Sequence, residues 1–194
     1  MSAQKFDQAN ALLQAGPQTG QDREMYALVL VKSLSLLNKS PKAVQAITRL
    51  VGDPEGTHDP GLLVAFAEAL LSIPSRTADG MKYLDRAVQL DPKNGEAWKY
   101  KGIAKCRELT EEKTKLSGEQ QRAVIEEAKS DLLKAAAFGQ KDASVQELLA
   151  GLYVASGDEV NAQQHLREAC EMNPKAAICV KLRAVLPHSS ASHD

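Results

Sequence analysis

Residues 146–174 read QELLAGLYVASGDEVNAQQHLREACEMNP, and this stretch decides the fold class. Apolar side chains recur at spacings of three and four residues, which is the pattern of an amphipathic α-helix. Gly157 suits the left-handed residue that ends a helix, and the side chain of Asp158 can cap the start of the next one. The stretch therefore predicts two helices joined by a tight corner.

The second helix of this stretch recurs along the chain, with small and large apolar residues at the same spacing. A fixed period indicates helix pairs stacked on one another instead of one closed bundle. The matching sets are Gly80, Leu84, Ala87, Leu90 and Pro92; Ala128, Leu132, Ala135 and Phe138; Ala162, Leu166, Ala169, Met172 and Pro174; and a weaker copy at Ala43, Ile47 and Leu50.

This pattern resembles the tetratricopeptide repeat (TPR) family, whose repeats of about 34 residues carry W-x2-L-G-x2-Y, then A-x3-F, then P. Residues 146–174 match best, and Trp98 and Gly102 fall where the family has Trp and Gly. Lys101 and Lys105 stand where the family has Leu and Tyr. The resemblance implies an all-α fold, a right-handed superhelical stack of antiparallel helix pairs known as a TPR-like α-solenoid.

We expect a single repeat domain over residues 1–187. Its third repeat is roughly fourteen residues longer than the family's period. The added stretch is rich in Glu, Lys and Gln, and Ser117 with Gln120 forms a capping box, so we predict two lengthened helices there. The expected parts are an N-terminal capping helix over 1–21, repeats over 22–56, 57–94, 95–141 and 142–174, a C-terminal capping helix over 175–187 in which Ile178, Leu182 and Val185 close the last pair, and a disordered tail over 188–194.

Composition excludes several classes of partner. The 24 basic residues nearly cancel the 25 acidic ones, so no field attracts nucleic acid or an anionic membrane. No apolar stretch approaches the roughly 18 residues that span a bilayer, and the first residues lack the pattern of a signal peptide. We therefore expect a cytoplasmic protein. Cys106, Cys170 and Cys179 form no CxxC pair and are expected to be idle thiols in a reducing compartment.

The sequence offers no constellation of catalytic or metal-ligating groups. None of its four histidines belongs to a metal-binding spacing, and no glycine-rich phosphate loop or G-x-S-x-G motif occurs. Cys170 follows His165 by five residues, but such positions on a repeat helix serve packing. We therefore predict a protein that is not an enzyme, with no cofactor and no metal.

The resemblance implies that the concave face of the first helices holds a peptide. One TPR subset grips the C-terminal carboxylate of heat-shock chaperones through paired Lys, Asn and Arg, and that constellation is missing here. The mostly apolar groove instead favours a partner that inserts hydrophobic anchors. The candidate groove residues are Leu28, Val29, Lys32, Val64, Ala65, Glu68, Lys99, Tyr100, Ile103, Leu148, Gly151 and Val154.

The predicted function is that of an adaptor that binds a protein or peptide segment. One alternative is a chaperone that shields an apolar segment of a client protein. Another is a self-assembling scaffold, in which Cys170, Cys179 and the last apolar helix meet a second copy and form a homo-oligomer. An enzyme is the weakest alternative, because it needs a cluster of converging polar side chains in the groove, and no sequence motif indicates one.

Overall fold

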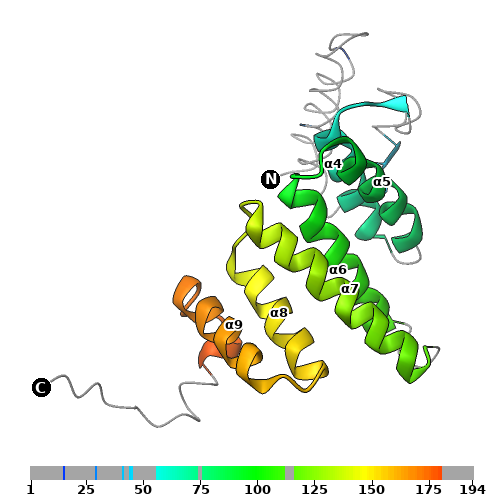
Figure 1. Cartoon of the computed structure of the whole chain (residues 1–194). Helices are drawn as coiled ribbons and strands as arrows, with labels where there is room; N and C mark the ends of the chain where they lie inside the picture. Colours follow the sequence, from blue (N-terminus) through cyan, green and yellow to red (C-terminus); the bar gives the residue numbers. More distant parts are fainter. Residues whose placement is uncertain are drawn as a thin grey trace, which may run out of the picture. The chain divides into compact units, whose positions relative to one another are not determined.

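The computed structural model describes residues 56–73, 76–111 and 116–180, with a few single residues before them. Within these ranges the chain forms α-helices joined by turns, and no strand occurs (Figure 1). The prediction of an all-α fold is confirmed. The expected N-terminal cap over 1–21 and most of the first repeat lie outside the described residues, as do residues 181–187 of the expected C-terminal cap and the expected tail over 188–194. The chain divides into two compact units, Met1–Ala104 and Lys105–Asp194.

The first unit contains the pair α4 (Pro60–Leu71) and α5 (Thr77–Leu90). The carboxylate of Asp59 accepts hydrogen bonds from the backbone amides of Gly61 and Leu62, as expected of a helix N-cap. The two helices cross closely at Gly80, where a Cβ atom would lie 3.0 Å from Cδ2 of Leu71. A glycine at this position therefore permits the tight α4–α5 packing.

The first part of α6 (Gly95–Glu111) completes the core of this unit. Ala97 and Ala104 of α6 are buried in one apolar cluster with residues of both earlier helices, and Tyr100 packs against that cluster. Lys101 pairs with Asp85 of α5, and its ammonium lies 5.3 Å from the centre of the Trp98 ring. The cluster consists of Leu63, Val64, Ala67, Leu71, Leu84, Ala87, Ala97 and Ala104.

The second unit contains the end of α6, then α7 (Gly118–Ala137), α8 (Ala143–Ala155) and α9 (Glu159–Met172), and residues 177–180 are again helical. Helices α6 and α7 have 17 and 20 residues, whereas the other named helices have 12 to 14. Ser117 and Gln120 form a reciprocal capping box at the start of α7. The predicted pair of lengthened helices is confirmed.

Helix α8 covers the pair formed by α6 and α7. Its residues Val145, Leu149 and Leu152 share one apolar cluster with Ile125, Ala128 and Leu132 of α7. Cys106 and Leu109 of α6 pack against the same cluster. Each of the two units therefore has a core in which one helix covers the preceding pair.

Lys105 stands where the TPR pattern has Tyr, and two carboxylates hold it. Its ammonium lies 2.9 Å from oxygens of both Glu127 and Asp131, and only 6% of the Asp131 side chain is exposed. Burial lowers the pKa of Lys105, but the two carboxylates outweigh that effect and leave the pKa above its ordinary value. At this position a positive charge thus takes the place of the Tyr ring of the TPR pattern, and α7 supplies the opposite charges.

The corner between α8 and α9 follows the sequence prediction. Gly157 has φ of +79°, and the carboxylate of Asp158 accepts a hydrogen bond from the amide of Asn161. The later Asn173–Pro174 step does not start a helix. Asn173 is the C-cap of α9, because its amide donates a hydrogen bond to the carbonyl of Ala169. A turn over 174–176 follows, and the next helical residue is Ala177.

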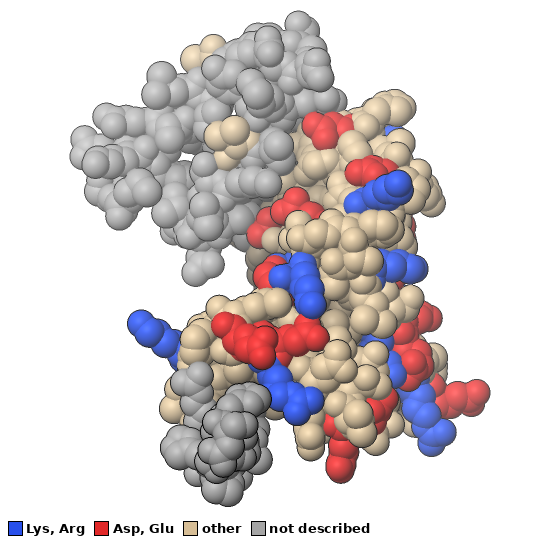
Figure 2. All heavy atoms as spheres, turned by 60° about the vertical axis from the view of Figure 1, so that its left-hand side comes forward, with Lys and Arg blue, Asp and Glu red and all other residues tan. Residues whose placement is uncertain are grey.

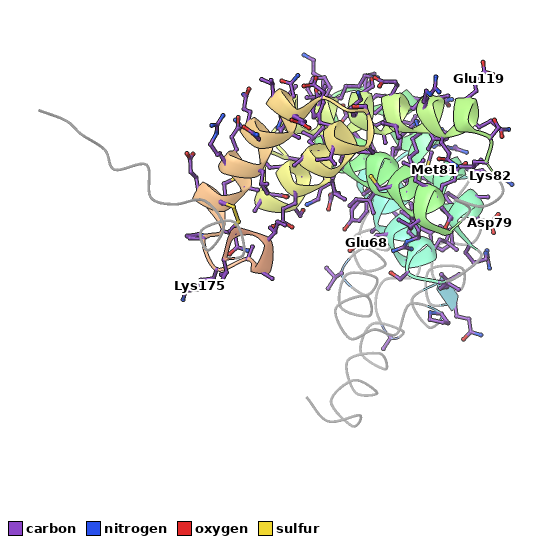
Figure 3. The ribbon with its side chains drawn as sticks, turned by 90° about the horizontal axis from the view of Figure 1, so that it is seen from below. Glu68, Asp79, Met81, Lys82, Glu119 and Lys175 are labelled. Atoms are coloured by element: carbon purple, nitrogen blue, oxygen red, sulfur yellow. A yellow bond between two sulfur atoms is a disulfide. The ribbon has the colours of Figure 1, made fainter. Side chains whose placement is uncertain are left out.

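The expectation of idle thiols is wrong for two of the three cysteines. Cys170 of α9 and Cys179 form a disulfide with Cα atoms 5.4 Å apart (Figure 3). Nine residues of sequence separation and a turn bring them together, which the absence of a CxxC motif did not reveal. Cys106 is a free thiol, and burial raises its pKa to about 11. The disulfide removes the cysteine-based argument for a reducing compartment.

Candidate functional site: an apolar groove between α8 and α9

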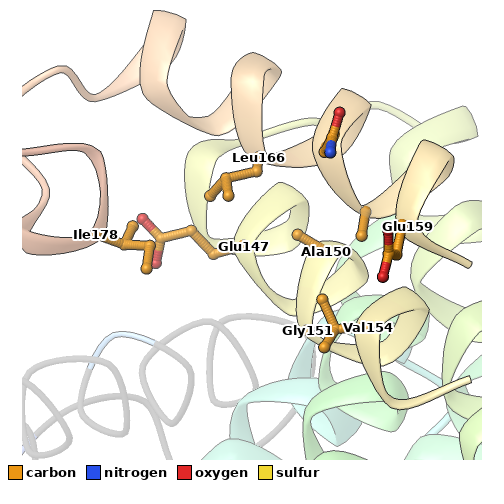
Figure 4. Close-up of a pocket in the computed structure, with 9 residues that line it drawn as sticks. Glu147, Ala150, Gly151, Val154, Glu159, Leu166 and Ile178 are labelled. Carbon is orange, nitrogen blue, oxygen red and sulfur yellow. The ribbon is translucent and has the colours of Figure 1, made fainter. Parts of the chain in front are cut away.

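A groove with a volume of about 470 Å³ lies along α8 and α9 (Figure 4). We call it the α8–α9 groove. Ile178, one of the helical residues after α9, lies at one of its ends. The remaining lining side chains come from two faces that the tight corner at Gly157 holds side by side. The groove is lined by Glu147, Ala150, Gly151, Val154, Glu159, Ala162, Gln163, Leu166 and Ile178.

Small residues create the hollow. Ala150, Gly151 and Ala162 leave space between the two helices, and a Cβ atom built at Gly151 would meet nothing within 4 Å. Val154 and Leu166 supply apolar walls, and Val154 is 66% exposed. The groove can therefore take apolar side chains of another molecule without rearrangement of its floor.

The repeat register shows why no described helix covers this surface. Leu84, Leu132 and Leu166 occupy one register position in three successive second helices. Leu84 and Leu132 are fully buried, in clusters completed by α6 and α8 respectively. Leu166 is only partly buried and lines the groove. The groove is the face on which the next helix of a repeat array packs.

Two carboxylates border the groove. Glu147 lies near Ile178 at one end, and Glu159 approaches the groove from the start of α9 (Figure 4). Neither carboxylate forms an ion pair with any described residue, whereas Glu126, Glu127 and Glu168 of the same unit each pair with a lysine. No Lys or Arg is among the groove's described lining residues. The groove is therefore apolar with an acidic border.

Polar side chains behind the groove fix the two helices against each other. Nδ1 of His165 lies 2.6 Å from Oε1 of Gln146, which is 1% exposed. The imidazole stacks on the Tyr153 ring with 5.2 Å between ring centres, and the Lys129 ammonium lies 4.9 Å from the centre of that ring. Burial lowers the pKa of His165 below its ordinary value, which favours the neutral form of the stacked imidazole.

The sequence-predicted groove residues are spread over both units. Gly151 and Val154 line the α8–α9 groove, and Leu148 packs against the core of the second unit. In the first unit, Val64 and Ala65 are each 1% exposed, so they offer a partner no surface. Leu28 and Lys32 lie outside the described residues. Val29 is exposed, Glu68, Lys99 and Ile103 are half-buried, and Tyr100 packs against the first unit's core.

Sequence reasoning missed most of the residues that line this groove. It treated Ala162 and Leu166 as packing residues because they follow the repeat register. The sequence did carry a signal: Ala162 and Leu166 belong to the last of the matching sets, and no further copy of the pattern follows them in this sequence. It missed Glu147 and Glu159 because glutamates are common on the solvent-facing sides of helices.

Other kinds of site have little support in the described ranges. No group of three metal-ligating side chains occurs among those residues, and none of the helices described is long and apolar enough to cross a membrane. On the face shown in Figure 2, basic and acidic side chains are intermingled, in keeping with the net charge of -1. Cys170 is bonded to Cys179, so it is not a thiol nucleophile beside His165.

The helix pairs and their register define a TPR-like α-solenoid, and comparison with solved structures agrees. YrrB, a TPR protein with an unusual peptide-binding site, superposes with a TM-score of 0.63 at 14% identity over 93% of this chain and 84% of its own. TTC0263, a thermophilic TPR protein of Thermus thermophilus, superposes with a TM-score of 0.62 at 17% identity, over 94% of this chain and 89% of its own. MamA superposes with a TM-score of 0.62 at 15% identity, over 88% of this chain and 87% of its own. No protein-family model and no curated protein matches the chain.

Proposed function

We propose that this protein is a non-enzymatic adaptor that holds a peptide or protein segment of a partner in the α8–α9 groove. The observation that carries the proposal is the half-buried Leu166, which lines an open groove while its two register equivalents are fully buried. Apolar side chains of a partner placed there would gain the burial that Leu84 and Leu132 obtain from α6 and α8. The similarity to YrrB, which has a peptide-binding site, supports the same class of function.

A matched pair of valines tests this proposal. Val154 lines the groove, and Val160 of α9 is 77% exposed outside it. We expect Val154→Glu to weaken partner binding at least about tenfold, because a carboxylate would be buried against apolar anchors. Val160→Glu should leave binding unchanged. Both valines are largely exposed, so neither change should unfold the protein.

The measurement is affinity capture from the native lysate with the wild-type chain and both variants, with circular dichroism as a check of folding. The proposal predicts one captured protein that is lost with Val154→Glu and retained with Val160→Glu. Identical capture by the two variants would show that the groove does not hold the partner.

A further inference from the structure

The two covered helix pairs indicate the shape of an occupant. Helix α6 places Ala97, Tyr100 and Ala104 on the α4–α5 pair, at spacings of three and four residues. Helix α8 places Val145, Leu149 and Leu152 on the α6–α7 pair at similar spacings. The α8–α9 groove is the same face of the next pair, so its shape suits a helix with an apolar stripe of this kind.

The border of the groove indicates the charge of an occupant. Glu147 and Glu159 approach it from different helices and have no cationic partner among the described residues. A Lys or Arg beside the apolar stripe of an incoming helix would pair with them, whereas a carboxylate there would be repelled. Electrostatic complementarity of this kind selects partners more than it adds affinity.

We infer that the α8–α9 groove binds an amphipathic helix of a partner protein whose apolar stripe is flanked by Lys or Arg. This inference rests on the proposed function, since it specifies the partner of the same groove. The apolar stripe would contact Val154, Leu166 and Ile178, and the flanking cations would face Glu147 and Glu159.

The test uses two synthetic, end-blocked and fluorescently labelled peptides with the full-length protein. The basic probe is KKALAALLAALAKK, and its matched control, EEALAALLAALAEE, has the same apolar stripe with the charges reversed. Fluorescence anisotropy should show saturable binding of the basic probe and at least about tenfold weaker binding of the acidic control. Raising the salt concentration should reduce this difference, because both carboxylates are near the surface.

Charge variants of the protein locate the effect. The double variant Glu147→Lys and Glu159→Lys should weaken binding of the basic probe about tenfold and strengthen binding of the acidic one. Glu171→Lys is the matched control, because Glu171 is an exposed residue of α9 outside the groove. That control should leave both affinities unchanged. A basic probe that binds the double variant and the wild type equally would overturn the inference.

Two further outcomes would assign the groove to another occupant and also overturn the inference. Residues 181–187, KLRAVLP, carry similar chemistry, and removal of residues 181–194 would raise probe affinity strongly if this segment filled the groove. A mass that doubles with concentration and reverts with Val154→Glu would assign the groove to a second copy of the chain.

The two proposals fail separately. Capture of a partner that depends on Val154, together with equal affinity for both probes, would refute only the charge preference. Selective binding of the basic probe without any captured protein that depends on Val154 would refute the adaptor function and leave the chemistry of the groove in place.

Discussion

The α4–α5 pair and the α8–α9 pair share a repeat register but differ in what covers them. Leu84 of the first pair is fully buried in a cluster that α6 completes, whereas Leu166 of the second is half-buried beside an open groove. The same residue at the same position is thus core in one pair and surface in the other. In a repeat fold, the following helix decides whether a register position is buried in the core or left at the surface.

The largest expected difference in unfolding free energy is between removing a charge that has an ion-pair partner and removing one that has no such partner among the described residues. Lys105→Met leaves the carboxylate of Asp131 buried without its cation, and we expect a loss of about 3 to 5 kcal/mol of unfolding free energy. Adding Asp131→Leu to Lys105→Met should recover most of the lost unfolding free energy. Glu147→Gln in the groove should cost almost nothing, because Glu147 has no ion pair with a described residue to lose. Urea unfolding measures all three, and equal losses for Lys105→Met and Glu147→Gln would contradict the contrast.

Alkaline pH tests the same ion pair. The pKa of Lys105 is raised above its ordinary value of 10.5, so its contribution to stability is complete below that pH. The contribution should disappear as pH rises through the raised pKa, when the ammonium loses its proton. Urea unfolding between about pH 9 and 12 should show a steeper alkaline loss for the wild type than for the Lys105→Met, Asp131→Leu variant. Parallel pH profiles would count against the ion pair.

Replacing the equivalent leucines of α7 and α9 by alanine compares the covered and the uncovered helix pair directly. Leu132→Ala should cost about 3 kcal/mol, because it removes a fully buried side chain and leaves a cavity. Leu166→Ala should cost about 1 kcal/mol, since its side chain already borders open space. Chemical denaturation gives both values. A Leu166→Ala loss as large as that of Leu132→Ala would show that another part of the molecule covers the groove in solution.

The disulfide tests how Ile178 is held at the end of the groove. Replacing Cys170 and Cys179 together by Ala should cost about 2 kcal/mol, since the bond closes a short loop at the edge of the second unit. Amide hydrogen exchange at residues 177–180 should accelerate, while exchange in α7 and α8 stays the same. Adding a reductant to the wild type should reproduce the effect and should not change the double variant. Unchanged exchange at 177–180 would indicate that other contacts hold Ile178.

Two helical glycines give the smallest expected effect. Gly151→Ala should stabilise the protein by up to about 1 kcal/mol, because alanine favours the helix and its Cβ meets open space. Gly80→Ala should bring no such gain, because its Cβ would lie 3.0 Å from the Leu71 side chain and 3.3 Å from the Ala67 carbonyl oxygen. Thermal unfolding compares the two. A similar gain at Gly80 would refute the close helix crossing there.

Much of the fold was predictable from local sequence. The caps at Asp59, Asp158 and Ser117 and the corner at Gly157 follow from side chains that satisfy neighbouring amides or permit a positive φ. The lengthened α6 and α7 follow from the interval between repeat copies. The caps and the corner depend on residues within a few positions of one another. The helix lengths depend on the spacing of the repeat copies, which can be read along the sequence.

The groove and the disulfide were less predictable because they depend on distant packing. Val64 shares the apolar character of Val154, yet it is buried in a cluster that α6 completes, whereas Val154 borders the groove. The turn after Asn173 brings Cys179 to Cys170, and no motif marks that return. Lys105 is half-buried, and its role becomes clear only beside Asp131 and Glu127.

The central claim is that the α8–α9 groove is a binding surface while its equivalents are core. Methyl NMR of the full-length protein, titrated with the peptide KKALAALLAALAKK, tests it most directly. We predict saturable shifts at the methyl groups of Val154, Leu166 and Ile178, with those of Leu84, Leu132 and Val160 unchanged. Shifts at Val160 with none at Val154 and Leu166 would contradict the claim.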